Sequence, residues 1–318
     1  MGYSCLLRNR ARKALSTHVP RRFTMSKRRF LTGSPPRITP ARGWSVPVSL
    51  ENRKMNRNVT TVGILAAAPQ PTHCNSWSAG PSVPVLSTDR VEVWRACLDE
   101  AEPLKTEPKT SVLSSDENAR ASRFHFRKDR ERFTRCRSAL REILAAYIAI
   151  PAAEIRFEYL PAGKPQLVAE QNRSALQFNL SHSGGMALIA VGQERRLGVD
   201  IETIRSDVDT AALAERYFST RERAALRALA HPLRLAAFYA GWTRKEAFLK
   251  ATGDGLSFPL ADFSVTTHPD LHPEIEEIHG DPAEGTHWAL TDLRGIDGYR
   301  AALAIEGSFS RLETYAWN

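Results

Sequence analysis

The chain has 318 residues, of which 42% are hydrophobic and 25% are charged, a composition that excludes a wholly disordered protein and allows one large domain or two smaller ones. Its formal net charge of +9 is unevenly distributed, because residues 1–58 hold 14 basic side chains and one acidic one, which leaves 30 basic against 34 acidic side chains in the rest. The basic character therefore belongs to the N-terminal segment and argues against nucleic-acid binding by the remainder.

The sequence predicts a cytoplasmic protein. Its longest apolar run, residues 62–69, is far shorter than the about 20 residues of a membrane-spanning helix, so we expect no membrane span. The first 30 residues spread their basic charge without the apolar core of a secretory signal. The four cysteines are far apart and form no C-x-x-C pair, which speaks against a structural zinc site and a disulfide framework; they are Cys5, Cys74, Cys97 and Cys136.

Residues 1–84 are predicted to be a basic, proline-rich, disordered extension, because they lack sustained helix or strand periodicity. Residues 69–87 have the proline, serine and glycine content of a linker. The composition fits an organelle-targeting segment, a polyanion-binding arm, or sequence upstream of a true start at Met25 or Met55. These three interpretations stay open.

Hydrophobic periodicity downstream predicts helices interleaved with strands, twice over. The first set comprises a strand within 83–94, helices over 116–126 and 129–150, and strands over 155–159, 176–180 and 187–191. The second set comprises a strand over 198–201, helices over 209–217, 220–229 and 232–252, and strands over 263–267, 287–292 and 299–305. This order predicts an α/β protein of two similar lobes, residues 85–192 and 193–318.

Two carboxylates alternate with apolar residues in the predicted strand at 198–202. Val199 and Ile201 point to one face, so Asp200 and Glu202 lie side by side on the other. Like charges at this separation raise each other's pKa unless water or a cation lies nearby. The pair therefore indicates either a solvent-exposed face or a site for a hard metal ion.

A third carboxylate falls on the buried face of the predicted helix at 232–252. Glu246 follows Trp242 by four residues and so lies within the apolar stripe. An ionised carboxylate in the interior must be paired, neutralised or bound to metal. Lys245 and Lys250 flank it, so an ordinary ion pair within the helix is the alternative to a metal ligand.

Taken together, residues 198–202 (Gly-Val-Asp-Ile-Glu) and 242–250 (Trp-Thr-Arg-Lys-Glu-Ala-Phe-Leu-Lys) resemble the two signature motifs of 4′-phosphopantetheinyl transferases, G-x-D-x-E and W-x-x-K-E-A-x-x-K. Between them, residues 217–222 resemble the F-S-x-x-E element of the larger, Sfp-type members. Upstream, residues 163–165 and 178–184 are similar to the G-K-P and N-x-S-H-S segments of the family. The resemblance covers about residues 85–318.

This resemblance implies a monomeric pseudo-dimer of two α/β lobes that binds coenzyme A and Mg²⁺ in the cleft between them. It implies transfer of phosphopantetheine to a serine of an apo acyl or peptidyl carrier protein, with release of 3′,5′-ADP. The implied metal ligands are Asp200, Glu202 and Glu246, for Mg²⁺ or Mn²⁺. The carrier protein and its pathway stay open.

The resemblance also implies roles for basic and acidic side chains around the coenzyme. Lys245 and Lys250 would contact its phosphates, and either Glu246 or Glu222 would accept the proton of the attacking serine. The remaining coenzyme contacts would be Arg120, Arg132 and Arg137 at the 3′-phosphate, Lys164 and Pro165 on the adenine side, and Ser181 and His182 at a phosphate. Glu117 departs from the pattern, because some members have a basic residue there.

Two other functions remain compatible with the residues alone. Three carboxylates could serve a different Mg²⁺-dependent phosphoryl or nucleotidyl transferase. The basic segment could instead make the chain a polyanion-binding protein without catalytic activity.

Overall fold

The computed structural model describes residues 72–73, 77–99, 112–255 and 258–317. Most of the predicted N-terminal extension, including the basic residues 1–58, therefore lies outside the described residues, as do Cys5 and Cys74. Within the described ranges, no helix is both long and apolar enough to cross a membrane.

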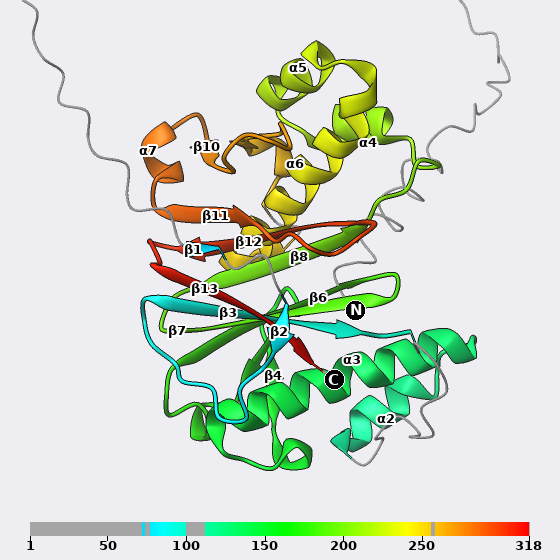
Figure 1. Cartoon of the computed structure of the whole chain (residues 1–318), viewed down its shortest axis with the longest axis vertical. Helices are drawn as coiled ribbons and strands as arrows, with labels where there is room; N and C mark the ends of the chain where they lie inside the picture. Colours follow the sequence, from blue (N-terminus) through cyan, green and yellow to red (C-terminus); the bar gives the residue numbers. More distant parts are fainter. Residues whose placement is uncertain (1–71, 74–76, 100–111, 256–257, 318) are drawn as a thin grey trace, which may run out of the picture.

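The N-terminal lobe is an antiparallel sheet with one long helix against it (Figure 1). Its elements in chain order are β3 (Arg90–Cys97), α2 (Ser115–Ala121), α3 (Arg127–Ile148), β4 (Phe157–Tyr159), β5 (Pro165–Leu167), β6 (Leu176–Ser183) and β7 (Met186–Gln193). The long strands lie in the order β3, β7, β6, while β4 and β5 form a separate hairpin.

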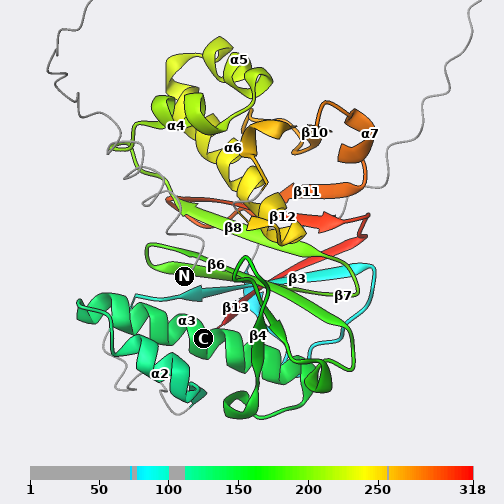
Figure 2. The same cartoon turned by 180° about the vertical axis from the view of Figure 1, so that it is seen from behind.

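The C-terminal lobe repeats this plan, with three antiparallel strands in the order β11, β12, β8 and α6 packed on them (Figure 2). Its elements are β8 (Leu197–Thr203), α4 (Thr210–Tyr217), α5 (Thr220–Ala228), α6 (His231–Thr252), β9 (Phe263–Val265), β10 (Ile275–Ile278), α7 (Pro282–Gly285), β11 (Trp288–Asp292) and β12 (Tyr299–Glu306). Each lobe thus combines three antiparallel strands, of which the first pairs with the last, with a 22-residue helix, which confirms the predicted α/β fold of two similar lobes.

The last strand crosses between the lobes, which corrects the predicted boundaries. Strand β13 (Arg311–Trp317) pairs in parallel with β3 of the N-terminal lobe, and its other edge pairs with β1 (Thr72–His73) and β2 (Ser78–Ala79). The prediction of a linker outside the fold is therefore wrong for β1 and β2. The physical reason is that the free edge of β13 offers main-chain groups that a short segment can pair with.

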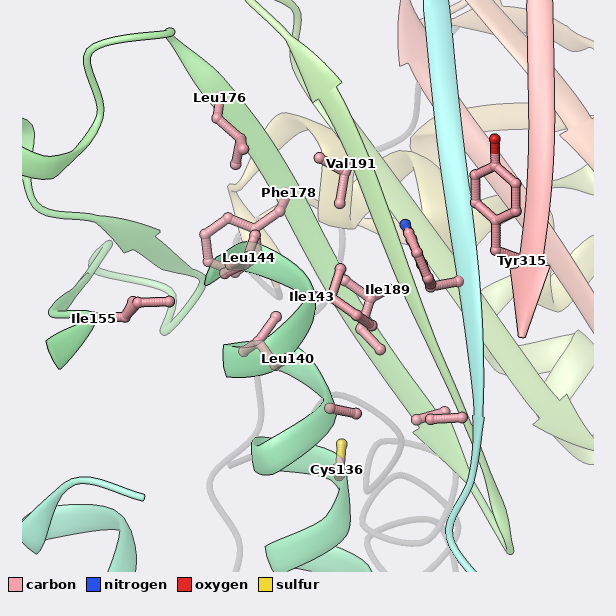
Figure 3. Packing of buried hydrophobic residues seen from close by; sticks show 14 of the residues in the cluster. Cys136, Leu140, Ile143, Leu144, Ile155, Leu176, Phe178, Ile189, Val191 and Tyr315 are labelled. Atoms are coloured by element: carbon pink, nitrogen blue, oxygen red, sulfur yellow. The ribbon is translucent and has the colours of Figure 1, made fainter. Parts of the chain in front are cut away.

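The core of the N-terminal lobe lies between α3 and the sheet (Figure 3). Leu140, Ile143 and Leu144 of the helix are at most 2% exposed and belong to one cluster with Phe178 of β6 and Ile189 of β7. Their spacing of three and four residues makes the apolar stripe that burial requires. This packing fixes β6, whose opposite face meets the other lobe.

Strands β6 and β8 meet through side chains instead of a main-chain ladder. Three alternate residues of β6 accept hydrogen bonds from backbone amides of β8: Asn179 from Val199 (2.9 Å), Ser181 from Ile201 (3.4 Å) and Ser183 from Thr203 (3.1 Å). We call these three pairs the polar seam. It joins the two lobes directly beside the carboxylates of β8.

Gly198 allows α6 to lie unusually close to β8. A Cβ at this position would be 2.2 Å from the carbonyl oxygen of Ala247 and 2.3 Å from the amide nitrogen of Ala251, both of which are backbone atoms that cannot rotate away. The signature strand and the signature helix therefore touch backbone to backbone.

We expect Gly198→Ala to destabilise the fold by about 1–3 kcal/mol, because the added methyl must push α6 away from β8. Denaturant unfolding measures this change. Gly192→Ala is the matched control, since its Cβ would meet only the end of the flexible Leu197 side chain at 2.8 Å. Equal losses in the two variants would contradict the close-approach argument.

A chain that starts at residue 85 should melt at a lower temperature than one that starts at residue 72. The shorter chain loses β1 and β2, the hydrogen bond from Trp77 Nε1 to the Arg294 carbonyl (2.9 Å), and the Trp77 ring that lies 5.3 Å from the Arg95 guanidinium. It also exposes the edge of β13, which favours aggregation. Identical melting temperatures and solubility would restore the boundary predicted from sequence.

Candidate active site

A buried polar cluster lies where the two signature motifs meet. The Lys250 ammonium of α6 is 2.6 Å from Oδ1 of Asp200 on β8 and 2.8 Å from Oγ of Ser181 on β6. Ser181 in turn donates to the same carboxylate oxygen at 3.0 Å. All three residues are at most 2% exposed. The predicted residues of both motifs and of the N-x-S-H-S segment are thus brought together.

Glu202 lies two residues further along the same face of β8. It accepts a hydrogen bond from Ser183 Oγ at 2.8 Å and is 5% exposed. Burial raises the pKa of Glu202 well above its ordinary value of 4.5, and repulsion from Asp200 and Glu246 raises it further, against the opposing effects of Ser183 and Lys250. Asp200 and Glu246 are therefore both close enough to repel the Glu202 carboxylate.

The carboxylates have the oxygen donors that a hard cation requires, but they are not grouped at metal-ligand distances. Oδ2 of Asp200 is buried and has no hydrogen-bond partner among the residues that the structure describes, and carboxylate oxygens are the donors that Mg²⁺ prefers. In the same part of the chain, no three His, Cys, Asp or Glu side chains are grouped as a metal centre. The Lys250 ammonium already neutralises part of the Asp200 charge.

Lys245 and Glu222 form a buried ion pair with each other. The Lys245 ammonium lies 2.6 Å from Glu222 Oε1 and donates to the Phe263 carbonyl, and neither side chain is exposed. Glu222 also accepts from the backbone amides of Ser219 (2.7 Å) and Val265 (2.8 Å). This pair ties α5, α6 and β9 together, so both side chains are engaged in the interior; the phosphate contact of Lys245 and the role of Glu222 as a base stay predictions.

Arg137, which the family resemblance assigns to the 3′-phosphate, lies in an interior ion-pair network, and its coenzyme contact stays a prediction. It pairs with buried Glu117, which bonds Arg141 at 2.6 Å as well, and both guanidinium groups lie within 5.2 Å of the Phe157 ring centre. Burial alone would raise the pKa of Glu117, but the two arginines and the Ser114 amide outweigh it, so the pKa lies below its ordinary value. The acidic residue that departs from the family pattern thus anchors an interior network.

Lys164 reaches from the β4–β5 hairpin to main-chain carbonyls of the C-terminal lobe. It is 7% exposed, and its ammonium donates to the carbonyls of Leu197 (2.9 Å) and Lys250 (2.7 Å). Pro165 begins β5 and, with Lys164, lines a cavity of about 370 Å³ at the end of α6. The adenine-side contact stays a prediction for both Lys164 and Pro165.

The other predicted coenzyme contacts lie on the α3 side of β6. Arg120 is exposed and lies 5.2 Å from the Phe133 ring, whereas Arg132 forms a two-pronged pair with Asp99, at 2.6 Å for each bond. His182 alternates with the seam residue Ser181 along β6, so it points to the opposite face. These residues stay candidates for contact with the coenzyme.

Two residues near the site, Ser183 and Asp99, were not among the candidates from the sequence. Ser183 could have been found, because it shares a strand face with Ser181 and Asn179 at period two. Asp99 carried no local signal, since its partner Arg132 lies 33 residues away in sequence.

Comparisons with known proteins agree with this geometry. Residues 196–304 match the model of the 4′-phosphopantetheinyl transferase superfamily, and residues 100–194 match that of the N-terminal domain of a 4′-phosphopantetheinyl transferase. The chain is 39% identical to the 4′-phosphopantetheinyl transferase HetI of Nostoc sp., over 73% of this chain and 94% of that protein.

Two further relatives extend the similarity. The 4′-phosphopantetheinyl transferase Sfp of Bacillus subtilis is 31% identical, over 52% of this chain and 71% of its own length. The L-aminoadipate-semialdehyde dehydrogenase-phosphopantetheinyl transferase of Xenopus laevis is 30% identical, over 61% and 68%. With both signature motifs meeting in one buried cluster and with similarity along nearly the whole of one relative, this chain belongs to the 4′-phosphopantetheinyl transferase family, in its larger, Sfp-type branch.

Proposed function

We propose that this protein transfers 4′-phosphopantetheine from coenzyme A to a serine of an apo carrier protein and releases 3′,5′-ADP. The observation that carries the proposal is the cluster of Lys250, Asp200 and Ser181, because side chains from three family segments converge there in the interior. The protein would act as a monomer in the cytoplasm.

In this reaction one phosphorus–oxygen bond forms and another breaks. The serine oxygen bonds to the phosphorus that carries pantetheine, and the bond from that phosphorus to the bridging oxygen of the pyrophosphate breaks, so that 3′,5′-ADP leaves with the electron pair. Lys250 is placed to stabilise the charge that develops on the leaving group. Asp200 and Ser181 hold its ammonium in position beforehand.

Glu246 is the better candidate for the proton acceptor. It lies on α6 one turn before Lys250 and is 2% exposed, whereas Glu222 is fully occupied by Lys245 and two backbone amides. Glu246 would take the serine proton directly or through a water molecule.

Mg²⁺ would be held by Asp200, Glu202 and Glu246, and would neutralise the pyrophosphate charge. The buried, unshared Oδ2 of Asp200 and the repulsion that Asp200 and Glu246 exert on the Glu202 carboxylate both favour a cation at this place. Mn²⁺ satisfies the same oxygen donors.

For the 3′-phosphate, Arg132 and His182 are the candidates that lie near the β6–β7 turn. Asp99 fixes the Arg132 guanidinium there, since the neighbouring Leu98 amide bonds the Gly185 carbonyl of that turn at 2.8 Å. A phosphate would have to replace Asp99 as the partner of the guanidinium, whose planar fork suits both anions.

The direct test is to incubate the protein with coenzyme A, Mg²⁺ and apo carrier proteins of fatty-acid, polyketide, peptide and lysine-pathway type, and to weigh each carrier by mass spectrometry. We expect a mass increase of one phosphopantetheine and an equal amount of 3′,5′-ADP. No mass change in any carrier would contradict the proposal, and transfer from a nucleotide instead of coenzyme A would favour a different phosphoryl or nucleotidyl transferase.

The two motif lysines should respond differently to substitution. Lys250→Ala should lower kcat by about 100-fold or more, because a donor at the developing charge is lost. Lys245→Met should instead lower the free energy of unfolding by about 3–5 kcal/mol, because it leaves Glu222 buried without its cation. Kinetics on the folded fraction and denaturant unfolding separate the effects; a large kcat loss in fully folded Lys245→Met would return that residue to the active site.

Mg²⁺ should raise the melting temperature more at about pH 8 than at about pH 6. Because the pKa of Glu202 is raised, this carboxyl keeps its proton at lower pH, and its ionisation at higher pH costs stability that a cation restores. Melting curves with and without Mg²⁺ at both pH values measure the effect. In Glu202→Gln both the shift and its pH dependence should shrink, and an unchanged Mg²⁺ effect would remove Glu202 from the metal site.

A further inference from the structure

Lys164 bridges the two lobes through one ammonium group. It sits in the β4–β5 turn of the N-terminal lobe, and its donors reach only main-chain carbonyls of the C-terminal lobe: Leu197 at 2.9 Å, Lys250 at 2.7 Å and Ala251 at 3.5 Å. No carboxylate of the described ranges lies within ion-pair distance of it. A buried cation that bonds only backbone therefore needs an explanation.

The turn aims this side chain at the other lobe. Gly163 has a φ of 85°, a conformation that glycine adopts freely, and the turn is closed by hydrogen bonds from the Gly163 amide to Leu160 (2.7 Å) and from the Leu160 amide to Lys164 (2.9 Å). The backbone of Lys164 is thus fixed before its side chain reaches across.

Two of its three acceptors belong to the last turn of α6. Carbonyls of a helix end have no partner within the helix, and a cation there is favoured by the helix dipole. The third acceptor, Leu197, opens β8 three residues before Asp200. One ammonium therefore holds the end of the helix that carries Lys250 against the start of the strand that carries Asp200.

The ammonium of Lys164 has few hydrogen-bond donors left for a ligand. The side chain is almost fully buried and its hydrogens are taken by the carbonyls. Burial, and to a smaller extent the positive charge of the nearby Arg196, together lower the pKa of Lys164 to about 8.

We propose that Lys164 is a positioning residue, which clamps the last turn of α6 to β8 and so sets the contact between Lys250 and Asp200, instead of binding the coenzyme itself. The kinetic part of this inference rests on the proposed function. The structural part does not, because the clamp exists without any ligand.

The test compares Lys164→Met, Lys164→Gln and Lys164→Arg in the full chain. Three quantities are measured: hydrogen–deuterium exchange of the backbone amides at 247–253, the dissociation constant of coenzyme A, and kcat and KM for coenzyme A. Glu158→Gln is the matched control, because Glu158 lines the same cavity and its side chain bonds, among the described residues, Gln166 alone, at 2.6 Å on the surface.

In the Met and Gln variants we expect faster amide exchange at 247–253 and a kcat that is lower by about tenfold or more. The dissociation constant of coenzyme A should stay within about twofold of the wild-type value, because a small displacement of a catalytic group lowers the rate more than it weakens binding. Lys164→Arg should recover most of both, and Glu158→Gln should match the wild type. If the Met variant does not fold, the Gln variant, which keeps a donor, decides.

A raised dissociation constant with unchanged kcat and unchanged exchange would overturn the proposal in favour of direct coenzyme contact. Unchanged exchange in both the Met and Gln variants would equally overturn the clamp. If the wild type itself transfers nothing from coenzyme A, the proposed function fails, while the exchange data still decide whether Lys164 fastens α6 to β8.

Discussion

The contact between Lys250 and Asp200 is the interaction on which the rest of the site depends. It exists because α6 and β8 touch backbone to backbone at Gly198, so that a lysine of the helix reaches a carboxylate of the strand directly. Without that approach, a long flexible side chain would have to span a wider gap. Every other group at the site, including Ser181, Glu202 and Glu246, is arranged around this pair of elements.

Helix geometry explains why neighbouring motif residues have different tasks. Glu246 and Lys250 are four residues apart and therefore lie on one face of α6, toward β8. Lys245 precedes Glu246 by a single residue, which turns it about 100° away, toward Glu222 and the Phe263 ring at 3.9 Å. The same short sequence thus supplies an active-site face and a structural ion pair, and residue type alone does not distinguish them.

Local periodicity explains what could be predicted from the sequence. The position of Asp200 and Glu202 side by side on one strand face follows from strand alternation, and the buried position of Glu246 follows from helical spacing. Partners distant in sequence could not be predicted: Glu222 lies 23 residues from Lys245, and Glu117 lies 20 from Arg137. Strand β13 was missed altogether, since the last predicted strand ends at residue 305, and its crossing into the other lobe could not be predicted either, because no local pattern records which sheet edge a strand joins.

The polar seam links the way in which the two lobes contact each other to the ionisation of Asp200 and Glu202. Ser181 and Ser183 each accept from a β8 amide while donating to Asp200 and Glu202 respectively. A hydroxyl can donate only one proton, so protonating or coordinating either carboxylate changes the bond that its serine can make. Because main-chain ladders are missing between β6 and β8, those serines and Asn179 carry the connection there. The state of the carboxylates therefore acts on the joint between the lobes as well as on the chemistry.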